Sequence, residues 1–375
     1  MSTQIERLNC AVKNYAWGKL GENSEVARLY VEGHEDKEIN SDTPYAELWI
    51  GTHPDVLLDL GQLPFIMKIM SIRHTLSLQV HPTKEQAILL NKQNPINYPD
   101  QNHKPELAYA LTRFELLCGF RPAGEILENM KAFPELCQAM GYQNTKQFIE
   151  LSKQFSPDSY EMINALRKCC SNNTIRAGLT NKFVDKANLI KVLNYRMTDP
   201  EYYFVIPQSV IGYPHVLEYA PNCRDFTLHA VEIKYNNRNV NEQFNFDLPT
   251  IECSSTFILT EGENIKCIEL NSKKCFVKQF MAKRGYIFYI PPMHTIRFLS
   301  NNGLYLKGFR TFSFEEGPDH SKRILSMNEK IKSKNIILNN DTSMDVIKQQ
   351  TTKTKLMLNP SLNIFDIETE MDGFL

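Results

Sequence analysis

The chain contains 375 residues with a formal net charge of −1, and 42% of its residues are hydrophobic. This balance excludes a strongly basic nucleic-acid binder and a largely disordered chain, and the length is typical of two or three domains. No apolar stretch approaches the roughly 18 residues of a membrane span, and residues 1–7 lack a signal-peptide pattern. Nine irregularly spaced cysteines favour reduced thiols. We therefore expect a soluble cytoplasmic protein with no nucleic-acid or membrane partner.

The N-terminal third shows short strand patterns separated by turns. Residues 63–70 are an apolar run of strand length, and residues 76–81 alternate between apolar and polar side chains, which predicts a strand that ends before Pro82. The segment Thr83-Lys84-Glu85-Gln86 is a capping box and predicts the start of a short helix. Strand character returns in two further runs, 106–111 and 114–117.

Helical periodicity replaces this pattern between residues 123 and 170, where three helices are predicted, and again over 186–195. Strand patterns then follow at 226–233, 256–259, 286–290 and 304–309. Strands on both sides of one helical block favour a mainly β fold, a cupin or jelly-roll architecture with a helical insert, that is, a β-rich α+β protein. The glycine motifs of dinucleotide-binding and P-loop proteins do not occur.

Three residues form a candidate metal site. Gln79 and His81 lie two residues apart on the predicted strand, so both side chains leave from its polar face. Glu106 follows at the start of the next predicted strand, after Lys104. Imidazole, carboxylate and amide oxygen together suit zinc or another borderline divalent ion. The same residues are also typical of an exposed strand surface.

Other candidates have a functional and a structural interpretation. Arg176 and Lys182 lie close together around a glycine, which suits a phosphate or a developing negative charge, but also a charged loop. Trp17 and Glu47 are candidates for lining a polar sugar pocket. Core packing is the alternative, and it is the favoured interpretation for Trp49.

Five segments, taken as an ordered set, resemble the type I mannose-6-phosphate isomerases. They are Tyr15-Ala16-Trp17-Gly18, 46–54, 76–82, 102–106 and 176–183. The resemblance covers most of 8–200 and is weaker over 225–312. It implies a monomeric cupin-type enzyme with one zinc ion per chain that interconverts mannose 6-phosphate and fructose 6-phosphate. This sugar-phosphate isomerase activity would supply mannose for GDP-mannose synthesis and protein glycosylation.

The resemblance also assigns residue roles by motif position. Gln79, His81 and Glu106 match three of the four zinc ligands of the family, and Arg176 matches its catalytic arginine. The positions that match substrate-binding residues are Trp17, Glu47, Ser77, Lys104 and Lys182. Aldose–ketose isomerisation moves a proton between C1 and C2 through an enediol, so that a metal ion and an arginine suit the charge that develops on oxygen. The sequence does not identify the base.

The chain departs from the family at one point. In the family, a strand with His-Ala-Tyr, then Gly-Asp and a Glu, precedes the segment that corresponds to 171–180; the His is the fourth zinc ligand and the Glu lies in the active site. Here a predicted helix over 159–170 runs directly into Ser171, and no histidine occurs between His103 and His215. A shortened isoform, a gene-model artefact and a divergent paralogue would each have this sequence.

The predicted organisation has four regions. Residues 1–122 with 171–200 form an incomplete catalytic cupin domain, 123–170 a shortened helical insert, 201–313 a C-terminal β domain and 314–375 a polar, weakly ordered tail. Besides a working isomerase, two functions are considered: a non-catalytic family member that binds a sugar phosphate or a protein, and a metal-dependent cupin oxygenase. The oxygenase receives little support, because its metal site needs two histidines.

Overall fold

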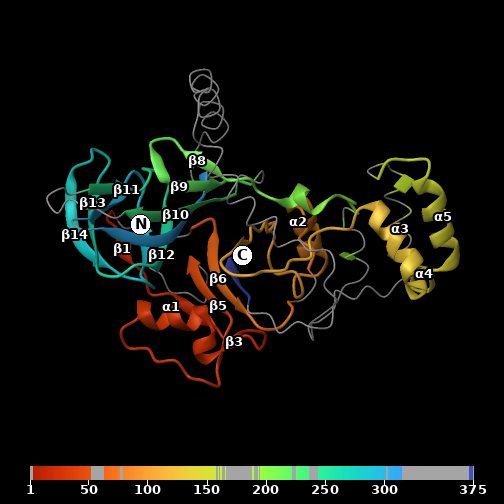
Figure 1. Cartoon of the computed structure of the whole chain (residues 1–375), viewed down its shortest axis with the longest axis horizontal. Helices are drawn as coiled ribbons and strands as arrows, with labels where there is room; N and C mark the ends of the chain where they lie inside the picture. The colour runs from red at the N-terminus through yellow and green to blue at the C-terminus, as the bar shows by residue number, and fades with distance from the viewer. Residues whose placement is uncertain are drawn as a thin grey trace, which may run out of the picture. The chain divides into compact units, whose positions relative to one another are not determined.

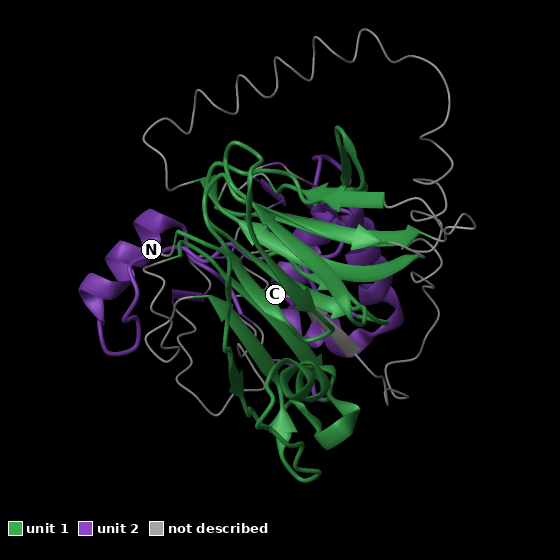
Figure 2. Ribbon diagram, turned by 90° about the vertical axis from the view of Figure 1, so that its left-hand side faces the viewer, with its two compact units in different colours: residues 1–73, 107–114, 206–375 green, residues 74–106, 115–205 purple. Residues whose placement is uncertain are grey.

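The computed structural model describes residues 3–51, 63–76, 79–157, 159, 161–162, 165, 188–189, 193, 195–221, 225–235, 244–300, 303–314 and 371–374. The chain divides into two compact units, which Figure 2 draws in green and purple. Unit 1 comprises residues 1–73, 107–114 and 206–375, and unit 2 comprises 74–106 and 115–205. None of the helices within the described ranges is long and apolar enough to cross a membrane.

A seven-stranded antiparallel sheet is the centre of unit 1, with strand order β1-β15-β12-β17-β10-β9-β8. Its strands are β1 (Glu6–Arg7), β8 (Gln208–Val210), β9 (Tyr213–Tyr219), β10 (Thr227–Tyr235), β12 (Ser255–Glu261), β15 (Ile287–Ile290) and β17 (Leu304–Phe312). Alternate residues point to opposite faces of a sheet. Since β12 and β17 are buried along most of their length, both faces of this sheet are covered.

A four-stranded sheet covers one face. It runs in the order β11-β16-β13-β14, with β11 at Phe244–Asp247, β13 at Ile265–Leu270, β14 at Phe276–Ala282 and β16 at Thr295–Ser300. Phe257 and Leu306 of the seven-stranded sheet belong to one buried cluster with Cys267 and Phe298 of the four-stranded sheet. The two sheets therefore form an antiparallel sandwich around a shared apolar core.

A five-stranded sheet shares a second core with the other face. Its order is β2-β5-β6-β18-β7, with β2 at Ala11–Lys13, β5 at Glu47–Gly51, β6 at Ile66–Ile72, β7 at Tyr109–Ala110 and β18 at Met371–Phe374. Leu48 and Ile69 of this sheet join Ile258 and Phe309 in the cluster. A small sheet of β3 (Lys19–Leu20) and β4 (Pro44–Tyr45) lies nearby in the chain, as does the 3₁₀ turn Gly21–Asn23.

Helix α1 (Glu25–Gly33) completes this second core. The Ser24 side chain accepts a hydrogen bond from the Ala27 N–H and so caps the first turn. Val26 and Leu29 are fully buried in the same cluster as β5 and β6, and Figure 1 shows α1 beside these strands. The mainly β architecture predicted from the sequence is thus confirmed, and the pairing of its strands is antiparallel.

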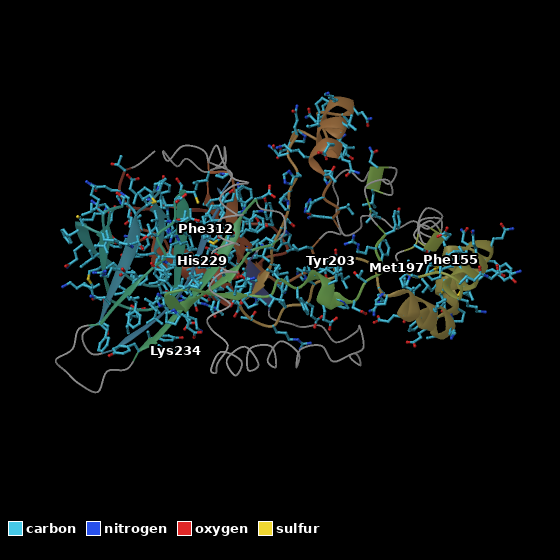
Figure 3. All side chains as sticks on the ribbon, turned by 90° about the horizontal axis from the view of Figure 1, so that it is seen from above. Phe155, Met197, Tyr203, His229, Lys234 and Phe312 are labelled. Atoms are coloured by element: carbon cyan, nitrogen blue, oxygen red, sulfur yellow. The ribbon has the colours of Figure 1, made fainter. Side chains whose placement is uncertain are left out.

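Unit 2 is mostly helical. Helix α2 spans Lys84–Gln93, α3 spans Ala123–Ala132, α4 spans Pro134–Met140 and α5 spans Tyr142–Ser152, and a 3₁₀ turn lies at Pro200–Tyr203. Fully buried Phe148 packs in one cluster with Met130, Met140 and Met197. The rings of Phe120 and Tyr195 stack with centroids 5.5 Å apart. Figure 3 labels Met197 and Phe155 in this part of the chain.

The structure confirms some predicted elements and corrects others. The capping box is present at Thr83, where the Gln86 N–H reaches the Thr83 side chain and the Thr83 N–H reaches the Gln86 side chain. The strand predicted at 76–81 is wrong for its described residues, which form no strand, and the strand predicted at 114–117 is also absent. Only Tyr109–Ala110 of the strand predicted over 106–111 is formed. The predicted tail lies outside the described residues except for Phe314 and strand β18. The predicted domain boundaries stay a prediction.

Candidate functional site

His81, Lys104 and Glu106 form a polar cluster in unit 2, here called the Glu106 cluster. The Glu106 carboxylate lies 3.1 Å from His81 Nε2 through Oε2 and 3.2 Å from Lys104 Nζ through Oε1. His81 immediately precedes Pro82 and the Thr83 cap of α2, so the start of that helix fixes the backbone beside it. The two carboxylate oxygens therefore face different partners, an imidazole and an ammonium group.

The electrostatics of this cluster keep Glu106 ionised. Burial on its own raises the pKa of the carboxyl, but the hydrogen bond and charge of His81 and the charge of Lys104 outweigh it. The net effect lowers the pKa of Glu106 to about 2. The side chains of His81 and Glu106 are 30% and 28% exposed, so both remain accessible to a ligand.

The donor set of the Glu106 cluster fits a zinc ion. Two protein donors on one tetrahedral zinc lie roughly 3–3.5 Å apart, because zinc–nitrogen and zinc–oxygen bonds are about 2.0–2.2 Å long. The 3.1 Å between His81 Nε2 and Glu106 Oε2 agrees with that spacing. Across the described ranges, no group of three or more His, Cys, Asp and Glu side chains gathers as a metal site. The third ligand predicted from the sequence is an amide, that of Gln79.

Gln79 lies in the same segment as His81 and is exposed. The strand that was expected to direct both side chains to one face is not formed, because residues 79–83 are in a coil conformation. The convergence of Gln79 with the Glu106 cluster therefore stays a prediction. Three other predicted site residues, Ser77, Arg176 and Lys182, lie outside the described residues.

Glu47 is the centre of a second polar cluster, in unit 1. It lies on β5, and its Oε2 accepts a hydrogen bond of 2.5 Å from Trp49 Nε1 and lies 3.5 Å from Lys68 Nζ on β6. The Trp49 ring in turn has Lys13 Nζ at 4.6 Å and Lys68 Nζ at 4.7 Å from its centroid. We call these four residues the Glu47 cluster. The side chain of Glu47 is only 9% exposed.

Trp49 corrects an expectation from the sequence. Core packing was the favoured interpretation, but Trp49 is half-buried and lies on the polar face of β5 with Glu47. The residues of this strand that pack in the core are Leu48 and Ile50, which are fully buried and alternate with Glu47 and Trp49. The alternation of side chains along β5 could have predicted this placement, because positions 47 and 49 lie on the same face of the strand.

Trp17 lies in the turn that precedes β3. Its ring stacks on Tyr15 with centroids 5.7 Å apart, and its carbonyl accepts a hydrogen bond of 2.9 Å from the Arg73 N–H. Gly18 follows, and it has no room for a side chain, because a Cβ there would lie 2.7 Å from the backbone of Ala46. The close approach holds Trp17 beside the strand that carries Glu47.

Sequence reasoning did not select Lys13 and Lys68. Lys68 is the single charged residue in the apolar strand β6, and it lies directly opposite Trp49 in the β5–β6 register. Lys13 lies opposite Glu47 in the β2–β5 register. A lone lysine in an apolar strand was the available signal, but its partner depends on strand pairing.

The chain matches known proteins over much of its length. A family model for the catalytic domain of type I phosphomannose isomerase matches residues 5–59 and 58–123. The mannose-6-phosphate isomerase of Mus musculus is 29% identical over 382 residues, which cover 70% of this chain and 88% of the mouse protein. That of Bos taurus is 30% identical over 347 residues, which cover 60% of this chain and 81% of the bovine protein.

Solved structures share the fold. The mannose 6-phosphate isomerase of Salmonella typhimurium, solved with fructose 6-phosphate and zinc, superposes with a TM-score of 0.56 at 17% identity over 83% of this chain and all of that chain. Together with the bovine relative, which this chain covers over four-fifths of its length, these matches establish the relationship. This chain belongs to the type I mannose-6-phosphate isomerase family of enzymes.

Proposed function

We propose that this protein interconverts mannose 6-phosphate and fructose 6-phosphate with a bound zinc ion. The observation that carries the proposal is the Glu106 cluster, in which the imidazole of His81 and the ammonium group of Lys104 each lie within 3.2 Å of the Glu106 carboxylate. We infer the reaction from membership of the family, and we infer zinc from the nitrogen and oxygen ligands that this cluster offers.

His81, Glu106 and Gln79 are the residues that would hold the metal. When bound, zinc would act as a Lewis acid that polarises the oxygens of the sugar. Glu106 is suited to this role because its low pKa of about 2 keeps it an anion throughout the neutral range. Lys104 balances that charge at 3.2 Å and is the cation of this cluster that is available to an anionic substrate.

Glu47 and Trp17 are proposed to bind the sugar, and Arg176, Ser77 and Lys182 are assigned by the family resemblance alone. A guanidinium at position 176 would stabilise the negative charge of an enediolate. We further propose a cytoplasmic enzyme whose product feeds GDP-mannose synthesis and protein glycosylation.

The test of this function uses the full chain. Purified protein is loaded with zinc, freed of excess metal and assayed for conversion of mannose 6-phosphate, beside Lys104→Met and an exposed-lysine control, Lys84→Met. We expect turnover that Lys104→Met lowers and Lys84→Met does not. No turnover with full zinc occupancy would contradict the proposal.

A second function is favoured by one observation. At the Glu106 cluster, the described residues bring together two side chains of the His, Cys, Asp and Glu types, His81 and Glu106, and no third one. The chain has no histidine between 103 and 215. A chain with an incomplete metal site would still bind a sugar phosphate or a partner protein without converting it. Calorimetric titration of the same sample with fructose 6-phosphate separates the two functions, because binding without turnover indicates the non-catalytic one.

A further inference from the structure

We propose that Trp49 is a positioning residue that fixes the Glu47 carboxylate so that one of its oxygens accepts a hydrogen bond from a hydroxyl of the sugar. The part of this inference that concerns the sugar rests on the proposed function. The part that concerns Trp49 and Glu47 rests on the geometry of strands β2, β5 and β6.

Strand alternation places these side chains on a common face. Glu47 and Trp49 are two residues apart on β5, and Leu48 and Ile50 between and beyond them are buried in the core on the opposite face. Lys68 lies opposite Trp49 in the β5–β6 register. The face that does not pack in the core thus carries an acid, an indole and a lysine side by side.

Two ammonium groups contact the Trp49 ring. Lys13 Nζ and Lys68 Nζ lie at similar distances from the ring, 4.6 and 4.7 Å from its centroid. Ammonium groups are attracted to the face of an indole, and this attraction is strongest for tryptophan among the aromatic side chains. These contacts fix the ring plane and therefore the direction of its N–H bond.

The N–H bond is aimed at one oxygen of Glu47. Oε2 accepts the Trp49 N–H at 2.5 Å, a short charge-assisted hydrogen bond, whereas Lys68 Nζ lies at 3.5 Å from the same atom. Oε1 accepts no hydrogen bond within the part of the chain that the structure describes. Oε1 is not one of the side-chain atoms that are fully buried without a partner, so a donor from outside the protein, such as a sugar hydroxyl, can reach it.

The indole also prevents a competing arrangement. Lys13 lies opposite Glu47 on β2, and Lys68, diagonally opposite on β6, already forms an ion pair of 3.5 Å with Oε2. A freely rotating carboxylate would turn Oε1 towards these lysines as well. Such an ion pair would occupy the acceptor that the sugar needs. Trp49 therefore acts on the substrate through Glu47 and not by direct contact.

The first measurement needs no substrate and no variant of Trp49. The chain has two tryptophans, so a ¹⁵N-labelled sample gives two indole N–H signals, which Trp17→Phe assigns. We expect the Trp49 signal downfield, and an upfield shift in Glu47→Gln, which removes the charge and keeps the shape. A Trp49 signal that does not respond to Glu47→Gln overturns the proposal.

The second measurement uses kinetics and a double-mutant cycle. Trp49→Phe keeps an aromatic ring and removes the N–H, and we expect it to raise the KM for mannose 6-phosphate by about 10- to 100-fold with a smaller change in kcat. Because Trp49 acts through Glu47, its effect should nearly vanish in a Glu47→Gln background. The matched control is Tyr45→Phe on strand β4, which also removes one polar group from an aromatic side chain. The Tyr45 hydroxyl accepts a hydrogen bond of 3.0 Å from the Asn40 N–H and forms no hydrogen bond with Glu47. Additive effects, or an equal rise of KM in the control, contradict the proposal.

A titration with fructose 6-phosphate separates this inference from the proposed function. A shift of the Trp49 signal on titration without any turnover supports the positioning role and contradicts the isomerase. Turnover without a shift supports the isomerase and overturns the positioning role. A buffer containing inorganic phosphate controls for the anion, because the hydroxyl of the sugar is the group in question.

Discussion

At the scale of single residues, Glu47 and Glu106 show two ways of holding an acid. Glu106 is held between two nitrogen groups, His81 and Lys104, and these lower its pKa to about 2 despite partial burial. Glu47 is more deeply buried, and a neutral donor, the indole N–H of Trp49, makes its shortest contact. The first arrangement suits a carboxylate metal ligand, which binds as an anion, and the second suits an oriented hydrogen-bond acceptor.

The first prediction concerns metal binding by Glu106. Glu106→Gln keeps the shape and removes the negative charge, so we expect zinc affinity to fall at least about tenfold, because an anionic ligand is replaced by a neutral amide. Zinc bound per chain after dialysis against a competing chelator measures this. The control is Glu85→Gln, an exposed acid of α2 whose carboxylate bonds to the Thr83 hydroxyl. Equal zinc retention by Glu106→Gln and wild type would remove Glu106 from the ligand set.

The second prediction is a pH dependence of stability that comes from His229. His229 lies on β10, its side chain is 3% exposed, and its Nε2 lies 3.0 Å from Glu218; its ring contacts Phe312 edge-on, and Figure 3 labels both residues. Burial lowers the pKa of His229 most strongly, Glu218 opposes this, and the charge of Arg310 lowers it further. The imidazole is therefore neutral in the folded protein at a pH where it is partly charged in the unfolded chain.

The sign of the effect follows from this difference. Below the unfolded pKa of about 6.5, the unfolded chain binds a proton that the folded protein does not, so the free energy of unfolding falls as the pH decreases from 7 towards 5. We expect His229→Gln to lose less stability over this range than the wild type in denaturant titrations at each pH. His74→Gln, at an exposed position, is the control and should behave as the wild type. Parallel curves for His229→Gln and wild type would show that His229 does not contribute.

At the scale of secondary-structure elements, helix α1 and the β14–β15 turn approach each other closely. A Cβ on Gly33, the last residue of α1, would lie 2.2 Å from the carbonyl oxygen of Gly285, and Gly285 has a φ of +85°. Arg284 in the same turn forms ion pairs with Glu25 and Glu32 of α1. The two glycines permit the contact, and the ion pairs orient it.

The third prediction tests this contact with two glycines of different surroundings. Gly33→Ala should lower the free energy of unfolding by about 1–3 kcal/mol, because the backbone of the turn must move. Gly124→Ala in α3 is the matched control, since a Cβ there meets nothing within 4 Å and alanine favours the helix by up to about 1 kcal/mol. Denaturant titration of both variants measures the difference. A neutral Gly33→Ala would mean that α1 is not held against the turn.

The elements that the sequence predicted well are those whose signal is local. The Thr83 cap and Gln86 are three residues apart, and the helix they predict is formed as α2. The alternating segment 76–81 carries an equally clear pattern but forms no strand in its described residues, because a strand also requires a neighbour that supplies hydrogen bonds. Alternation within the segment gives no information about that neighbour.

The same distinction separates the two polar clusters. Lys104 and Glu106 are two residues apart in one motif, and sequence reasoning selected both together with His81. The Glu47 cluster depends on the register between β2, β5 and β6, which brings Lys13 and Lys68 to Trp49 from distant positions in the chain. Side-chain pairs across strands follow from pairing, and pairing is a property of the sheet rather than of its sequence segments.

At the scale of the whole molecule, unit 1 is assembled from the two ends of the sequence. β1 near the N-terminus pairs with β15, and β18 near residue 375 pairs with β6 and β7. Between these pairings lies the helical block of unit 2, so the strands of unit 1 are joined by contacts of large sequence separation. Such topologies form slowly and tolerate the loss of an interior strand poorly, since its loss leaves two unpaired edges.

The last prediction concerns the segment that the family resemblance leads us to expect before Ser171, with its His-Ala-Tyr strand and its active-site Glu, and that this sequence does not contain. Three protein ligands are sufficient for a catalytic zinc, but the family uses four, and without the fourth we expect weaker metal binding. The absent Glu also removes a carboxylate that can transfer protons, a contribution of about 10²–10⁴-fold. We therefore expect the 375-residue chain to be a weak isomerase. Inserting the segment before Ser171 should raise zinc retention and turnover together, measured on zinc-loaded samples of both proteins; comparable turnover would mean that another residue of this chain supplies what the segment provides.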